Sequence, residues 1–392
     1  MDMVMAHPTR LDTPGLLAAV VLGTLGGLTI MIVPGFVGLV GSLTGLDDQS
    51  LGYVASWDIN AMAVAIGAGT FLISRFNWRH LALLALAIIG IGNLWTATCV
   101  TYPAVVAARV LAGCGEGLAI AVSFAALGSA SNPDRAFGIY LVVGLTVSAG
   151  ILVVLPALQV LIGPSAMFIG LALIAVSAAA IVKWLPTHSS MSAVNALDGV
   201  SIQKVMTVAG LTGVFLYFIA QGAMWSYFER IGASNGIDPD VIGQAMGVSS
   251  FSGTGGALVA VLLTSRVSRA WLLAGSGAIS LLSFWLLMGT VSAAQLFVAG
   301  ILFNFGWNLA QPLLSGVCAE ADARGRVVVA MGCIQTVGFG VGPALAAALL
   351  TGHNFVPAAW MSTAVLICSL AIVLGGLRAR GLQSMPRNSA VP

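Results

Sequence analysis

Long apolar runs separated by short polar breaks fill the chain from residue 15 to residue 377. A helix needs about 20 apolar residues to cross the hydrocarbon core of a bilayer, and each run is about that long. The runs are continuous rather than alternating, and backbone groups in lipid must be hydrogen-bonded within their own segment, so the pattern predicts helices and not barrel strands. The twelve expected spans are 15–41, 51–74, 80–101, 104–130, 137–162, 164–186, 205–230, 240–264, 269–291, 293–319, 326–351 and 355–377.

Breaks that contain lysine or arginine alternate along the chain with breaks that contain almost none. Apart from Arg109 and Arg230, every lysine and arginine lies before the first run, after the last run, or in every second break. Cytoplasmic loops of membrane proteins carry an excess of basic residues, so the order predicts that both termini are cytoplasmic. The basic residues that define it are Arg10, Arg75, Arg79, Arg135, Lys183, Lys204, Arg266, Arg269, Arg324, Arg326, Arg378, Arg380 and Arg387.

The two halves of the chain echo one another. The longest polar stretch, 187–204, reads as a cytoplasmic linker between a six-helix half at 1–186 and a second at 205–392. The string SRFNWRHLALL begins at Ser74 and SRVSRAWLLAG begins at Ser265, an offset of 265 − 74 = 191 residues. The loops near Asp134 and Asp322 correspond at a similar offset. Parallel six-span repeats are typical of transporters that hold their substrate between the halves near the bilayer midplane.

Composition narrows the function classes. Hydrophobic residues make up 59 % of the chain and charged residues 7 %, against roughly a quarter in soluble domains. Mean hydropathy is +1.03, and twelve spans leave no room for a soluble catalytic domain. The net charge of +2 without a basic cluster argues against nucleic acid as a partner. Nucleotide-binding, nucleophile-elbow and zinc-protease motifs are absent, and the five cysteines have no metal-ligand spacing, so we expect no enzyme, no cofactor and no metal.

Ser74, Arg75 and Arg79 lie in the loop between spans 2 and 3, and Arg109 begins a glycine-containing segment in span 4. These two motifs resemble those of the major facilitator superfamily, and the resemblance extends over the full length. The first is similar to that family's basic loop between spans 2 and 3. Ser74 takes the place of the usual aspartate, which implies a weaker charge lock with the neighbouring helix. In span 4, Arg109 with Gly113 and the glycines after it resembles the Arg-x-x-x-Gly-x-Gly pattern of many proton-coupled exporters. The glycine-rich exporter motif of span 5 is missing, and a similar string occurs instead in span 11, at 338–343.

The resemblance implies an all-α integral membrane fold of twelve transmembrane helices in two six-helix pseudo-repeats. It also implies a monomer that moves a small molecule by alternating access. Basic loops and short termini fit the bacterial inner membrane.

Three ionisable residues in spans 2 and 4 are candidates for proton coupling, because charges inside a membrane are costly and are kept for function. Arg109 and Glu116 share one face of span 4 but lie about 10 Å apart along it, so we expect no direct contact without other partners. Burial opposes ionisation of a carboxyl group and a nearby cation favours it, so Arg109 within reach could let Glu116 exchange a proton near neutral pH. Asp58 in span 2 is a second candidate; its alternative is an aspartate that faces water at the mouth of the span.

Span 7 ends in a polar and aromatic string. Glu229 is a further candidate for proton coupling, or for an external gate with Arg230, although both could simply mark the interface. Trp225 could contact substrate or, with Tyr227, belong to an interfacial aromatic belt. Gln221 lies deeper and is the better candidate for substrate contact.

Span 10 carries a polar face with one large aromatic side chain. Offsets of 3, 4 and 7 place the four residues on one side of the helix. The face predicts a cavity wall, on which the polar groups orient a ligand while the tryptophan stacks against it. The alternative is hydrogen bonding between helices. The residues are Asn304, Trp307, Asn308 and Gln311.

The sequence therefore predicts a secondary transporter that exports a drug-like compound or metabolite against protons. Import or uniport of an aromatic or weakly anionic metabolite is the close alternative, because the span-5 exporter motif is missing. A membrane receptor on the same fold is the least favoured class.

Overall fold

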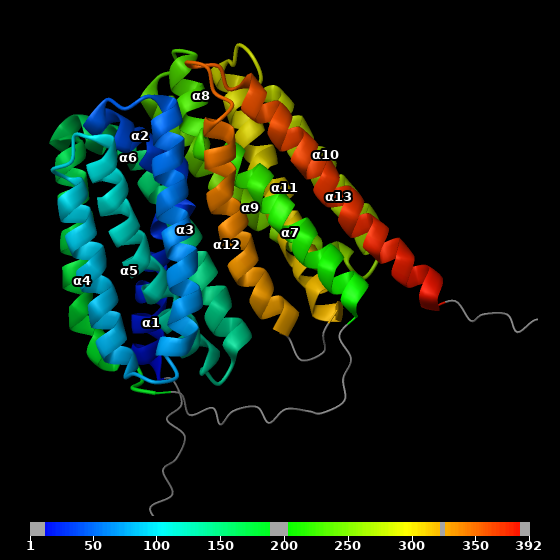
Figure 1. Cartoon of the computed structure of the whole chain (residues 1–392), viewed down its shortest axis with the longest axis horizontal. Helices are drawn as coiled ribbons and strands as arrows, with labels where there is room; N and C mark the ends of the chain where they lie inside the picture. The colour runs from blue at the N-terminus through cyan, green and yellow to red at the C-terminus, as the bar shows by residue number, and fades with distance from the viewer. Residues whose placement is uncertain (1–11, 189–202, 322–325, 385–392) are drawn as a thin grey trace, which may run out of the picture. The chain divides into compact units, whose positions relative to one another are not determined.

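The computed structural model is all-helical and describes residues 12–188, 203–321 and 326–384 (Figure 1). Its α-helices are α1 (Thr13–Met31), α2 (Val33–Thr44), α3 (Asp48–Leu72), α4 (Trp78–Thr96), α5 (Tyr102–Gly128), α6 (Pro133–Ala178), α7 (Lys204–Ser226), α8 (Phe228–Ser234), α9 (Pro239–Leu263), α10 (Arg269–Leu286), α11 (Ala293–Ala321), α12 (Arg326–Ala347) and α13 (Val356–Ser384). A short 3-10 helix, η1 (Ala179–Trp184), continues α6.

The helices confirm the twelve expected spans, with three differences in where helix breaks fall. The first span is divided into α1 and α2 at Ile32, two residues before Pro34. Spans 5 and 6 run together as α6 and bend at Gly163, whose φ of 79° is accessible to glycine and sterically costly for other residues. The seventh span is interrupted at Tyr227, so that α8 begins as a separate short helix.

Among the described residues, ten helical segments are long and apolar enough to cross a membrane. One of them covers both α6 and η1 and therefore holds two expected spans. Helix α3 is not among the ten; it carries Asp48, Asp58 and Asn60. The protein is thus a multi-pass integral membrane protein in which one helix carries polar side chains that need a protein environment.

The chain forms two compact units, each described here by itself. Unit 1 comprises Met1–Ala196 and Trp225–Gly247, and unit 2 comprises Leu197–Met224 and Val248–Pro392. The expected halves, 1–186 and 205–392, differ from this grouping because α8 and the flanking turns of α7 and α9 are grouped with unit 1.

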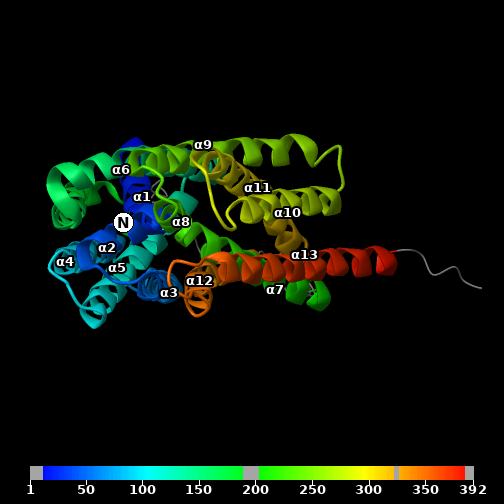
Figure 2. The ribbon, with the colours of Figure 1, turned by 90° about the horizontal axis from the view of Figure 1, so that it is seen from above.

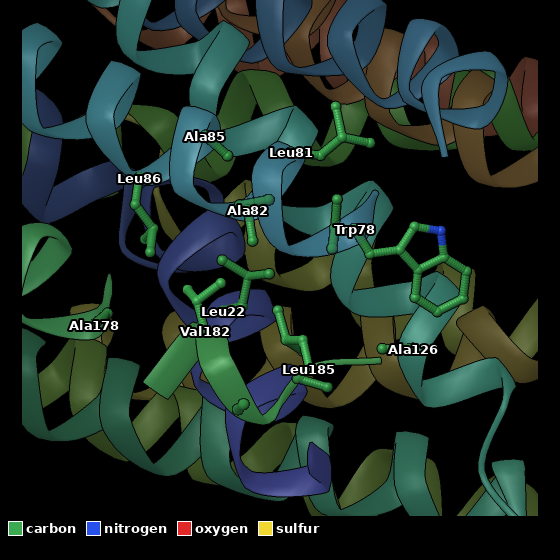
Figure 3. Packing of buried hydrophobic residues seen from close by; sticks show 14 of the residues in the cluster. Leu22, Trp78, Leu81, Ala82, Ala85, Leu86, Ala126, Ala178, Val182 and Leu185 are labelled. Carbon is green, nitrogen blue, oxygen red and sulfur yellow. The ribbon is translucent and has the colours of Figure 1, made fainter. Parts of the chain in front are cut away.

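In unit 1, α1, α4, α5 and η1 enclose a core of small and aliphatic side chains (Figure 3). Trp78 closes this core at the start of α4; it is 2 % exposed, and its Nε1 donates a 2.9 Å hydrogen bond to the carbonyl of Ile73. Alanines such as Ala82 and Ala85 let the helices approach closely, as is usual where lipid offers no hydrophobic drive for association.

Unit 2 is held by similar small-residue contacts. Helices α7 and α13 lie side by side, and a Cβ at Gly213 would collide with Val373 (Figure 2). The hydroxyl of Ser369 on α13 donates a 2.7 Å hydrogen bond to the carbonyl of Gly213. Between α10 and α11, Ser283 donates to the carbonyl of Ala299 at 2.8 Å.

The two loops that carry the repeated string have the same backbone path. After α3, the amides of Arg75 and Phe76 both donate to the carbonyl of Leu72. After α9, the amides of Arg266 and Val267 both donate to the carbonyl of Leu263, again 191 residues later. The side chains of Asn77 and Ser268 then cap α4 and α10. The loop near Asp322 lies outside the described residues, so this second correspondence stays a prediction.

Helices α3 and α5 of unit 1 pack closely because α5 presents glycines to α3 (Figure 1). A Cβ at Gly113 would collide with the carbonyl oxygen of Asp58, and one at Gly117 would collide with that of Met62. The glycines after Arg109 thus set the distance between the two helices.

Replacing Gly113 by alanine should therefore destabilise the fold by about 1–3 kcal/mol, because the two backbones must separate. Gly128 is the control on the same helix, since a Cβ there would meet nothing within 4 Å. Thermal unfolding in detergent micelles measures both variants. Equal unfolding temperatures for Gly113→Ala and Gly128→Ala would contradict the close approach.

Candidate functional site

The centre of unit 1 holds a buried ionic cluster of Asp58, Arg109 and Glu116. Arg109 donates from Nε and Nη2 to Oδ2 of Asp58, at 3.0 and 2.8 Å. The same Nη2 donates to Oε1 of Glu116 at 3.0 Å. Asp58 and Arg109 are 0 % exposed and Glu116 is 2 % exposed, so all three side chains are shielded from solvent.

Arg109 and Glu116 touch directly, although the sequence led us to expect no contact between them without other partners. Their backbones are two turns apart on α5, and the arginine is long enough to close the gap. The other partners are present, since Asp58 also binds Arg109 and Thr29 also binds Glu116. Glycine at 113, between the two residues, leaves the face open for α3 to bring in Asp58.

Three further residues complete the cluster. Thr29 on α1 donates from Oγ1 to Oε1 of Glu116 at 2.8 Å. Arg109 donates from Nη1 to Oδ1 of Asn93 on α4 at 3.1 Å, and its guanidinium carbon lies 4.6 Å from the centre of the Phe36 ring. Sequence reasoning missed all three. An asparagine inside the apolar run 80–101 was an available signal, whereas nothing in the sequence sets Thr29 or Phe36 apart from their neighbours.

The cluster has one carboxyl group more than its cations can match. Asp58 Oδ1 and Glu116 Oε2 are buried and have no hydrogen-bond partner among the described residues. An unpaired charge in a low-dielectric interior is costly, and such a site usually becomes neutral instead. Two carboxyl groups and one guanidinium are neutral together when one proton is bound.

Glu229 lies apart from this cluster, on α8. Its neighbour Arg230 forms a 2.6 Å ion pair from Nε to Oδ1 of Asp48, the first residue of α3. Tyr227 donates from its hydroxyl to the backbone carbonyl of Asp48 at 3.0 Å. Trp225 and Tyr227 are both buried, so their rings lie inside protein rather than at an exposed interface.

The polar face of α11 lies in unit 2 and is hydrogen-bonded to neighbouring helices. Asn304 donates to Oγ of Ser249 on α9 at 3.2 Å, and Gln311 donates to Oε1 of Gln335 on α12 at 3.1 Å. Asn308 donates to the carbonyl of Asn304 at 2.9 Å. The first two bonds join helices, as the alternative to a cavity wall would have it. Asn308 and Gln311 remain partly accessible.

Trp307 on this face lies within a group of aromatic rings. It stacks on Phe339 of α12 at 5.4 Å between ring centres, and the edges of Phe303 and Phe218 approach at 6.0 and 5.9 Å. Its Nε1 donates to Gln311 at 3.4 Å. Gln221 on α7 is fully buried; its amide donates to Ser280 at 3.5 Å, and its Oε1 has no partner among the described residues.

The basic loop after α3 is held by backbone contacts. Ser74 donates to the carbonyl of Phe71 at 2.7 Å, and Arg79 donates from Nε to the carbonyl of Leu185 at 2.6 Å. Arg75 is exposed. The corresponding loop of unit 2 does form an ion pair, between Arg269 and Glu320 at 2.9 Å.

No family model matches the chain, and no curated protein matches it in sequence. Solved structures match it in fold. The nucleoside transporter NupG, as a D323A mutant, superposes with a TM-score of 0.73 at 13 % identity, over 91 % of this chain and 99 % of that one. A D-xylose-proton symporter gives 0.71 at 14 % identity, over 91 % and 96 %. The chain shares its fold with these transporters.

A third structure of this fold is a bacterial homolog of the human lysosomal transporter Spinster. It superposes with a TM-score of 0.65 at 15 % identity, over 93 % of this chain and 94 % of that one. Coverage is above nine tenths in all three cases, and identities of 13–15 % mean that the likeness is one of architecture.

Proposed function

We propose that the protein is a proton-coupled secondary transporter that moves a small organic molecule by alternating access. The Asp58–Arg109–Glu116 cluster is its proton site, and the polar and aromatic face of α11 contacts the substrate. Both termini lie in the cytoplasm of a bacterial cell and the chain works as a monomer in the inner membrane.

One observation carries the proton-coupling proposal: two buried carboxyl groups share a single arginine nitrogen, Nη2 of Arg109. The cluster is electrically balanced with one proton bound and carries one excess negative charge without it. Loss of that proton inside a membrane is costly unless the surroundings change. A conformational change that opens the cluster to water would therefore be linked to release of the proton, as coupled transport requires.

The substrate that fits the α11 face is neutral or weakly charged and at least partly aromatic. The described side chains of that face offer amides and aromatic rings but no fixed charge. Gln221 and Trp225 on α7 are further candidates for substrate contact. A highly charged substrate such as a sugar phosphate would find no counter-charge there.

We favour export, because Arg109 with its following glycines resembles the exporter pattern of span 4. Import is the second candidate, supported by the fold likeness to a structure that is named a D-xylose-proton symporter. In export the compound and the proton cross the membrane in opposite directions, whereas in import they cross in the same direction.

The test uses purified protein in proteoliposomes that contain a pH-sensitive dye. A panel of small aromatic, amphipathic and vitamin-like compounds is added outside, and proton flux is followed. When the compound is added outside, symport acidifies the lumen and antiport alkalinises it, so a single active compound identifies class, ion and direction. Binding of compounds without any flux would contradict proton coupling.

Replacing Trp307 by alanine should weaken binding of the active compound by about tenfold or more, since one stacked ring contributes roughly 0.5–1.5 kcal/mol in addition to the area it buries. Trp307→Phe should retain most of the affinity. The control is Trp285→Ala on α10, where the ring is 57 % exposed and faces away from the core of unit 2. Equal loss in both alanine variants would argue against a substrate contact at Trp307.

A further inference from the structure

A pocket of about 400 Å³ lies in unit 1 between α2, α6, α8 and α9. None of the three residues of the buried ionic cluster lines it. Most of its wall is apolar, and one carboxylate, that of Glu229, forms part of the wall. The apolar part of the wall includes Leu155, Pro156, Val160, Ile242 and Met246.

The carboxylate of Glu229 is held in place without being satisfied. Gly38 on α2 lies so close that a Cβ there would come within 2.6 Å of both the carboxyl carbon and Oε2 of Glu229. Oε2 is buried and has no hydrogen-bond partner among the described residues. A buried acceptor of this kind costs free energy unless a donor reaches it.

The neighbouring charges do not supply that donor. Arg230 also lines the pocket, but it is paired with Asp48 through the 2.6 Å contact between Nε and Oδ1. Asp48 itself is 2 % exposed, so this pair is held in protein on one side. The three groups together carry one net negative charge when ionised, and that excess charge lies at the pocket wall.

We propose that this pocket is a second ligand site, separate from the coupling cluster and the α11 face, which binds a monovalent organic cation with apolar substituents. The ammonium group lies against Glu229 and its substituents lie against the apolar wall formed by α6 and α9. A cation without apolar substituents would leave that wall unfilled, and an apolar molecule without charge would leave Oε2 of Glu229 unsatisfied. The ammonium can belong to a free solute or to the headgroup of an aminophospholipid.

The experiment measures binding to the full chain in dodecyl maltoside micelles by equilibrium dialysis. The probe is N,N-dimethylbenzylammonium, whose N–H can donate to Glu229, and the comparison ligand is isobutylbenzene, in which a carbon replaces the charged nitrogen. The cation should bind saturably and at least about tenfold more tightly than its neutral counterpart, a difference of about 1.4 kcal/mol. Equal binding of the two ligands would overturn the proposal.

Three variants locate the site. Glu229→Gln keeps the shape of the side chain and should weaken binding of the cation by about tenfold or more. Asp240→Asn removes one negative charge from the exposed start of α9, outside the pocket wall, and should leave affinity unchanged. Ala233→Leu adds bulk to the wall without changing charge and should also weaken binding. Full affinity in both Glu229→Gln and Ala233→Leu would overturn the proposal; Ala233→Leu decides alone if Glu229→Gln does not fold.

The source of the ammonium is then determined by competition. Phosphatidylethanolamine or phosphatidylglycerol is added to the micelles at equal concentration. If the ethanolamine lipid weakens probe binding and the glycerol lipid does not, and if the ethanolamine lipid has no such effect in Glu229→Gln, the site binds an aminophospholipid headgroup. Unchanged probe binding with both lipids assigns it to a free organic cation.

Discussion

Replacing Arg109 by methionine is expected to destabilise the protein by about 3–5 kcal/mol, the usual cost of leaving a buried charge without its partner. Asp58 and Glu116 would then face one another with no cation, and Asn93 would lose the donor that its Oδ1 accepts. Methionine replaces the aliphatic stem of arginine but not its guanidinium group, so the loss combines the missing charge with a small cavity. Thermal unfolding in detergent micelles and the yield of folded protein measure it.

Removing all three charges separates stability from coupling. The triple variant Asp58→Leu, Arg109→Met, Glu116→Met has no buried charge in the cluster, and buried ion groups can often be replaced by apolar residues of similar volume without loss. We expect it to regain most of the parent's unfolding temperature while showing no substrate-driven proton flux. A parent-like unfolding temperature in the single Arg109→Met variant would show that the cluster does not depend on its cation.

Replacing Glu116 by glutamine is expected to abolish proton-driven accumulation while leaving downhill exchange of substrate intact. Glutamine keeps an oxygen that can accept from Arg109 and Thr29, so the geometry of the cluster is retained. The variant pairs one carboxylate with one guanidinium and has no exchangeable proton to carry. Asp58 accepts two hydrogen bonds from Arg109 where Glu116 accepts one, so Glu116 is the carboxyl group we expect to bind and release the proton.

Proteoliposomes with a pH-sensitive dye report the coupled flux, and counterflow of labelled substrate reports exchange. Glu320→Gln is the control; it removes a carboxylate of unit 2 that is 37 % exposed and paired with Arg269. That variant should keep both activities. Unchanged pH-dependent transport in Glu116→Gln would remove Glu116 from the mechanism. If proton-driven accumulation were lost in Asp58→Asn but not in Glu116→Gln, the proton-binding role would belong to Asp58.

Hydropathy predicted the helices well, because a segment in lipid has little choice of structure once it is long and apolar. The run 51–74 predicted α3 as well, although this helix is not among the ten segments that are long and apolar enough to cross a membrane. The repeat between Ser74 and Ser265 also predicted two loops that share a backbone path. The helix break at Tyr227 was not predicted, because it lies inside a run whose composition does not change, whereas Pro34 was an available signal for the break at Ile32.

The sequence by itself determined the class of protein, the number of spans and the residue types that could carry chemistry. Spacing placed Arg109 and Glu116 on one helix face, but it could not show that they touch, nor that Asp58 shares the same arginine. Contacts between helices depend on which faces meet, and small residues such as Gly113 decide that only when the whole unit packs. The tertiary structure therefore decided the site. It joined three separate candidates into one cluster with an excess carboxyl group, and it placed Glu229 in a pocket of its own.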